Sequence, residues 1–197
     1  MSIIIKTKKM KKIFIVTLLI LINISCKAQI VPIEKLIDYI KQNQGVPEGT
    51  SYIKDINNLR DKFVGVWKGT YENNIYEIQI VKQIDHFLID EDVISMRYKI
   101  TNLNGTVLED TRLLPNDNPY VTYSRYFEKS WFVLTYEGRE SKCGQRGELF
   151  VEPLETTNYK TMELFLVPSQ DFLIETDCPN GAAKQLFPKT QMLLTKQ

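Results

Sequence analysis

Apolar and polar residues alternate with a period of two over most of the chain after residue 62. In the clearest run, Asp92–Thr101, the side chains of Ile94, Met96, Tyr98 and Ile100 fall on one face. This period is typical of a β-strand that buries one of its faces. Alternating or short apolar runs predict further strands at Trp67–Tyr71, Tyr76–Ile80, Thr106–Thr111, Tyr120–Phe127, Trp131–Tyr136, Glu148–Glu152, Tyr159–Val167 and Gln191–Thr195.

Short turns such as Glu72–Asn74 and Leu103–Gly105 join these segments, and no helical pattern lies between them. Strands without crossover helices form an antiparallel meander. An open meander of about nine strands would leave long unpaired edges, which closure removes. The sequence therefore predicts a mainly β fold, a single antiparallel up-and-down β-barrel of about eight or nine strands. A β-sandwich is the alternative.

A helical pattern precedes the strands. Four isoleucine or leucine side chains recur at helical spacing between Ile33 and Ile40, and Gly45 suits a stop. We expect a short amphipathic helix over about residues 33–43. A linker or an irregular lead-in strand follows over residues 44–60.

The first 25 residues have the organisation of a signal peptide. A basic segment, Lys8–Lys12, precedes an uninterrupted apolar run, Ile13–Ile22. A helix of this length spans about 15 Å, whereas crossing a bilayer core takes roughly 20 residues. The run is therefore too short for a permanent transmembrane helix and has the length of a signal-peptide apolar region.

Ser25-Cys26 resembles the lipobox of bacterial lipoproteins, in which the cysteine is acylated and becomes the new N-terminus, although Asn23 stands where leucine is usual. The alternative is cleavage after Ala28, which would release a soluble protein. We expect a signal peptide over 1–25, a lipid-anchored tether with the helix and lead-in segment over 26–61, and the barrel domain over 62–197. The chain would then lie on the periplasmic or surface side of the cell envelope, held to the membrane through Cys26.

Removing residues 1–25 changes the charge of the protein. They hold five lysines and no acid, so the remaining chain has 20 basic and 24 acidic side chains and a net charge of −4. A surface of that sign has no electrostatic reason to bind nucleic acid or anionic lipid.

Once Cys26 is lipidated or removed, Cys143 and Cys178 remain as a pair in turn-like contexts. In an oxidising compartment such a pair forms a structural disulfide, and two buried free thiols are the alternative. A metal site would need more ligands, and the chain has a single histidine, His86. No metal or other cofactor is expected.

The sequence contains no recognisable catalytic motif. Asp85 and His86 are adjacent, so on a strand they point to opposite faces and do not form a dyad. The acidic run Asp90–Asp92 lacks the alternating ligands and the glycine turn of a calcium loop. No G-x-S-x-G motif is present. These observations favour a protein that is not an enzyme.

The motif Gly65-Val66-Trp67 resembles the Gly-x-Trp signature in the first strand of lipocalins and their relatives. In that family the tryptophan closes one end of the barrel, and a basic residue of the last strand packs over it. The resemblance makes Lys196 the candidate for this contact, where the family has arginine. It implies a lipocalin-like barrel that can hold a ligand.

Bulky side chains at inward positions are candidates for a cavity wall: Trp67, Tyr76, Met96, Tyr98, Phe127 and Trp131. In a small barrel the same positions also form an ordinary packed core. The first hypothesis is a binder of a small apolar ligand or peptide. The second is a structural or protein-interaction lipoprotein of the envelope, which would use exposed aromatic residues such as Tyr120, Tyr123 and Tyr126.

Several short motifs carry a broader resemblance: Ser25–Gln29, Val46–Gly49, Tyr52–Leu59, Val64–Thr70, Cys178–Gly181 and Leu193–Gln197. Through them nearly all of the chain after the signal peptide resembles an uncharacterised family of small exported proteins from Bacteroidetes-type bacteria. The family is a domain of unknown function. The resemblance therefore implies an envelope location and no activity.

Overall fold

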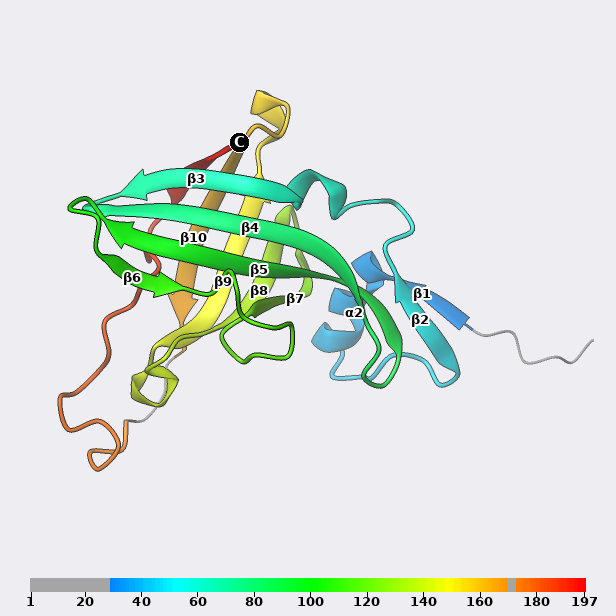
Figure 1. Cartoon of the computed structure of the whole chain (residues 1–197). Helices are drawn as coiled ribbons and strands as arrows, with labels where there is room; N and C mark the ends of the chain where they lie inside the picture. Colours follow the sequence, from blue (N-terminus) through cyan, green and yellow to red (C-terminus); the bar gives the residue numbers. More distant parts are fainter. Residues whose placement is uncertain (1–28, 170–172) are drawn as a thin grey trace, which may run out of the picture.

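The computed structural model of the chain describes residues 29–169 and 173–197, and in them the alternating segments form strands (Figure 1). The predicted signal peptide, Cys26 and Ala28 lie outside the described residues. Within the described part, no helix has the length and apolar character that a membrane span requires.

The strands from residue 65 onward form a closed antiparallel barrel of eight positions. The barrel closes because β7 pairs with β5 and β11 pairs with β3. The predicted up-and-down β-barrel is thus confirmed. Its strands are β3 (Gly65–Tyr71), β4 (Asn74–Asp85), β5 (Asp90–Asn102), β6 (Val107–Asp110), β7 (Thr122–Glu128), β8 (Trp131–Glu137), β9 (Arg146–Pro153), β10 (Thr161–Pro168) and β11 (Met192–Lys196).

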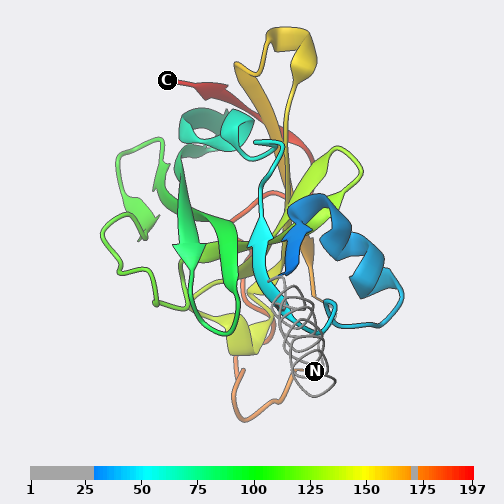
Figure 2. The same cartoon turned by 90° about the vertical axis from the view of Figure 1, so that its right-hand side faces the viewer.

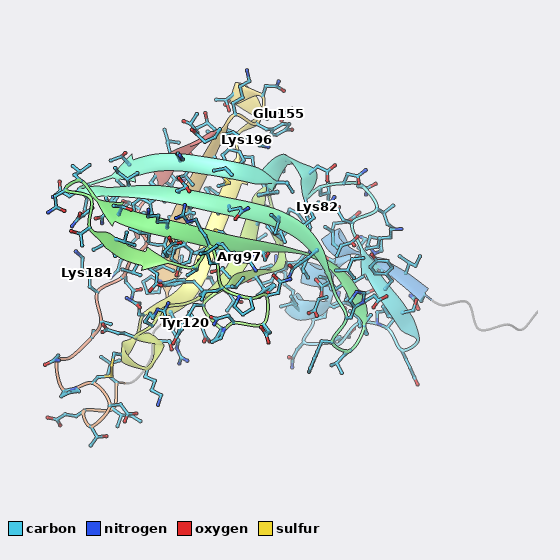
Figure 3. All side chains as sticks on the ribbon, viewed as in Figure 1. Lys82, Arg97, Tyr120, Glu155, Lys184 and Lys196 are labelled. Atoms are coloured by element: carbon cyan, nitrogen blue, oxygen red, sulfur yellow. A yellow bond between two sulfur atoms is a disulfide. The ribbon has the colours of Figure 1, made fainter. Side chains whose placement is uncertain are left out.

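Strands β6 and β7 share one position of the barrel. Both pair antiparallel with β5, β6 near its C-terminal end and β7 near its middle. They are therefore two parts of one strand, interrupted by the loop of residues 111–121. Arg97 on the outer face of β5 holds this loop, because its Nε donates to the carbonyl oxygen of Leu114 at 3.2 Å (Figure 3).

A small N-terminal unit packs beside the barrel, and Figure 2 faces it. It consists of β1 (Gln29–Pro32), a 3-10 turn (Ile33–Lys35), α2 (Leu36–Lys41) and β2 (Thr50–Lys54). Strand β1 pairs parallel with β2, which in turn pairs parallel with the start of β5. The helix α2 is shorter than the predicted helix over about residues 33–43, because its first turn is a 3-10 turn and it ends at Lys41. Within the segment over 44–60, the predicted lead-in strand is β2.

The inward side chains of the strands fill the barrel. Since an eight-stranded barrel is just wide enough for side chains to fill it, this interior is a packed core. Its buried members are Phe63, Trp67, Tyr76, Ile78, Ile80, Ile94, Met96, Tyr98, Ile100, Phe132, Leu134, Tyr136, Leu149, Val151, Met162, Leu164, Leu166, Phe187, Met192 and Leu194. All of them lie on barrel strands except Phe63 and Phe187, which close the two ends.

Candidate functional site

One end of the barrel is closed around Trp67. Its indole Nε1 donates to the carbonyl oxygen of Phe63 at 2.7 Å, and the ammonium group of Lys196 lies 5.0 Å from its ring centroid. This is the contact that the Gly-x-Trp motif predicts for Lys196. Gly65 makes it possible, since it has φ +137° and a Cβ there would lie 2.8 Å from Lys196 Cε.

A buried arginine seals the same end from the side of the lead-in segment. The Arg60 side chain has no exposed surface, and its guanidinium lies 5.4 Å from the Phe132 ring centroid and 3.7 Å from a carboxylate oxygen of Glu91. Burial lowers the pKa of Arg60 and raises the pKa of Glu91. The Asp55 carboxylate fixes the backbone here by accepting from the N–H groups of Leu59 and Arg60.

The opposite end, which we call the mouth, is closed by a loop. Between β10 and β11 the chain crosses the mouth, and the part over residues 182–190 is here called the cap segment. Phe187 of the cap segment is 2% exposed and points into the barrel. Its ring centroid lies 4.8 Å from Tyr98, 5.1 Å from Tyr136 and 6.1 Å from Tyr76. A side chain from a loop thus completes the core.

The cap segment is tied to the rim of the barrel. The predicted disulfide between Cys143 and Cys178 is confirmed, with the Cα atoms 5.5 Å apart, and it joins this connection to the β8–β9 loop. Ala183 N–H donates to the carbonyl oxygen of Cys143 at 2.8 Å. The Tyr76 hydroxyl donates to the carbonyl oxygen of Leu186 at 2.9 Å, and Leu186 directly precedes Phe187, the side chain that plugs the mouth.

Two polar atoms lie unsatisfied beneath Phe187. The hydroxyl groups of Tyr98 and Tyr136 are buried and interact with each other, but neither makes a hydrogen bond of normal geometry with a described residue. Burial raises the pKa of both phenols, so both are neutral donors at physiological pH. A buried hydroxyl without a partner costs about 1–3 kcal/mol, and such a group calls for an explanation.

A groove open to solvent lies beside the cap segment, and Tyr76 and Phe187 are among its lining residues. It has a volume of about 500 Å³ and lies between the cap segment and the β3–β4 hairpin. From the hairpin it is lined by Tyr71, Glu72, Asn74 and Tyr76. Its volume falls in the range of small-molecule sites.

The structure separates the six side chains that the sequence nominated for a cavity wall. Trp67, Tyr76, Met96 and Tyr98 are buried inside the barrel. Phe127 packs at the junction of the barrel core and the N-terminal unit. Trp131 lies on the outer face of β8, because the following residue, Phe132, points into the core.

Trp131 belongs to an outer aromatic patch with Phe150 and Phe165. The ring of Phe165 packs edge-on against Trp131 and stacks on Phe150, each with a centroid distance of 5.1 Å. The three side chains lie on adjacent strands β8, β9 and β10 and are partly exposed.

The other nominated surface residues make local contacts. Tyr120 lies 4.5 Å beneath the guanidinium of Arg139, and Tyr126 packs on the core of the N-terminal unit. His86 Nδ1 lies 2.8 Å from an Asp90 carboxylate oxygen in an exposed loop. Within the described residues, no group of three or more histidine, cysteine or acidic side chains is placed to hold a metal ion.

A family model described as a family of unknown function, DUF6705, matches residues 10–163. The chain belongs to this family. No curated protein and no solved structure matches the chain. The expectation of a family without an assigned activity is therefore confirmed.

The DUF6705 match covers the N-terminal unit and the barrel strands up to the start of β10. The cap segment, Cys178 and Lys196 lie beyond the matched residues. Family membership therefore rests on the N-terminal unit and the barrel strands up to β10, and the segment that closes the mouth lies outside the match.

Proposed function

We propose that this DUF6705 protein is an exported, lipid-anchored and non-catalytic binding protein. Its ligand would be a small apolar molecule with one polar atom, taken up at the mouth of the barrel. One observation carries the proposal: Phe187, a side chain from a tethered loop, fills an aromatic site above two unpartnered tyrosine hydroxyls.

The contacts of Phe187 support this interpretation. Its neighbours Tyr76, Tyr98 and Tyr136 form an apolar wall, and their ring faces favour a flat or aliphatic group of similar size. A ligand that displaced Phe187 would also offer its polar atom to Tyr98 or Tyr136. It would thereby replace one apolar occupant and satisfy a donor that Phe187 leaves unpaired.

Decanol is a suitable probe, because it has an aliphatic chain and one hydroxyl group. We expect saturable NMR shifts of the Phe187, Tyr98 and Tyr136 ring signals on titration into the whole protein. In the double variant Tyr98→Phe/Tyr136→Phe, the affinity should fall about five- to tenfold, because the hydrogen bond to the ligand is lost. The free energy of unfolding should stay the same or rise by up to about 1 kcal/mol, since an unsatisfied hydroxyl is removed.

Tyr39→Phe on α2 is the matched control and should leave decanol binding unchanged. If decanol causes no saturable shift at these rings in the natural protein or in Phe187→Ala, the proposed site is wrong.

The anchoring part of the proposal rests on Ser25-Cys26 after the apolar run of the signal peptide. We expect mass spectrometry of the protein from its host to give a mature N-terminus at Cys26 that carries acyl groups. Cys26→Ser should abolish the acyl mass. An unmodified N-terminus at Gln29 would instead establish cleavage after Ala28.

The outer aromatic patch favours a second candidate, an envelope lipoprotein that binds another protein. Exposed aromatic clusters are typical centres of protein interfaces. If decanol does not bind and cross-linking in intact cells captures a partner that Trp131→Ser loses, this function replaces the first.

A further inference from the structure

A second hollow lies outside the closed end of the barrel, away from the mouth. It has a volume of about 550 Å³ and opens to solvent. Three separate segments meet there: the lead-in turn before β3, the β9–β10 turn and the end of β11. The lining side chains are Asn58, Leu59, Asp61, Lys62, Asn158, Tyr159, Lys160 and Lys196, and we call this hollow the lysine pocket.

The charges around the lysine pocket are not balanced. No ion pair between described residues involves Lys62, Lys160 or Lys196. The single acid in the lining, Asp61, is already paired with Lys82. Three lysine side chains therefore line one hollow, and none of them has an ion-pair partner among the described residues.

This excess is local, since the chain without residues 1–25 has a net charge of −4. Like charges that converge on a pocket repel one another and need a reason to stay together, such as an anion that binds between them.

Two of the lysines are held in place by aromatic rings. Lys196 Nζ lies over Trp67 and donates to the carbonyl oxygen of Lys62 at 3.4 Å. Lys62 Nζ lies 5.4 Å from the Phe63 ring centroid and 5.6 Å from that of Tyr159. Tyr159 has φ 57°, a conformation that costs a non-glycine residue energy. The strained turn thus places an aromatic ring beside one ammonium group.

We propose that the lysine pocket binds a phosphate monoester. Such a group carries close to two negative charges and offers several acceptor oxygens, which suits three lysine ammonium groups better than a single carboxylate does. The pocket is larger than a phosphate ion, so its ligand has a polar body next to the phosphate, facing Asn58, Asn158 and Tyr159. The same group occurs on soluble metabolites and on the lipid phosphatidic acid.

Glycerol 3-phosphate is the soluble probe, and vesicles of phosphatidylcholine with phosphatidic acid are the lipid probe. Both are offered to the full chain with Cys26→Ser, so that no lipid anchor competes with the vesicles. We expect glycerol 3-phosphate to shift the Trp67 indole N–H signal saturably in low salt, because the indole lies beneath Lys196. The double variant Lys62→Gln/Lys160→Gln should weaken this binding about tenfold or more.

Lys184→Gln/Lys189→Gln is the matched control, since it removes the same charge from the cap segment and leaves the lysine pocket intact; Figure 3 shows Lys184 far from Lys196. It should bind as tightly as the parent protein. Binding of glycerol 3-phosphate alone assigns a soluble ligand. Co-sedimentation with phosphatidic acid vesicles that Lys62→Gln/Lys160→Gln abolishes assigns a lipid headgroup. If neither probe binds, or if both double variants bind equally, the proposal is overturned.

Discussion

Replacing Phe187 with alanine is expected to lower the free energy of unfolding by about 3–5 kcal/mol, the usual cost of removing a buried phenylalanine ring. The side chain is 2% exposed and contacts three tyrosine rings, so its removal leaves a cavity at the centre of the mouth. The cap segment cannot collapse into that cavity easily, because the disulfide and the hydrogen bond from Tyr76 hold it. Urea unfolding of the oxidised protein measures the change.

Phe87→Ala is the matched control, because Phe87 is 83% exposed and the same ring is removed from a surface loop. Phe87→Ala should change the free energy of unfolding by no more than about 0.5 kcal/mol. The Phe187→Ala cavity is lined by aromatic rings and should admit decanol more tightly than the natural protein does, since no plug has to be displaced. If Phe187→Ala lowers the free energy of unfolding by less than about 1 kcal/mol, Phe187 does not complete the core.

The barrel could be predicted from the sequence because its strands follow a local rule. In β5, for example, Ile94, Met96, Tyr98 and Ile100 are all buried in the core, as their spacing requires. Antiparallel neighbours joined by short turns need no distant information, so the order of the strands follows from the order of the segments.

The N-terminal unit was only partly predictable because its pairing is not local. Strand β1 is four residues long and pairs parallel with β2, on the other side of α2. Such a short segment shows no period of its own. Trp131 illustrates a different limit: it and Phe132 are adjacent aromatic residues, and the sequence does not say which of the two faces the core.

The candidate sites were beyond the sequence because each is made of distant segments without a period. Phe187 lies in an irregular connection, where an apolar residue gives no sign of its direction. The one signal in the sequence was Cys178, nine positions earlier, since a disulfide in that connection implies that it is held against the barrel. The lysine pocket combines residues near 60, 160 and 196, which only the closure of β11 onto β3 brings together.

Replacing both Cys143 and Cys178 with serine is expected to lower the free energy of unfolding by about 3–4 kcal/mol, because the disulfide restricts the conformations of the unfolded chain. The two residues are 35 positions apart, which makes the closed loop long. The loss of stability should also appear locally, where the cap segment contacts the barrel. The amide of Leu166, which donates to the carbonyl oxygen of Pro188 in the cap segment at 2.7 Å, should exchange its hydrogen faster.

The natural protein under reducing conditions should show the same lowered stability, whereas oxidised Cys26→Ser should unfold like the natural protein. If the double serine variant keeps full stability but exchanges the Leu166 amide faster, the disulfide acts on the cap segment alone. If neither property changes, the hydrogen bonds of the cap segment are sufficient to hold Phe187 in the mouth. In that case a ligand that displaces Phe187 has to break hydrogen bonds of the cap segment, and the disulfide does not oppose it. The hydrogen bond from the Tyr76 hydroxyl to the Leu186 carbonyl oxygen would then set the energetic barrier to binding.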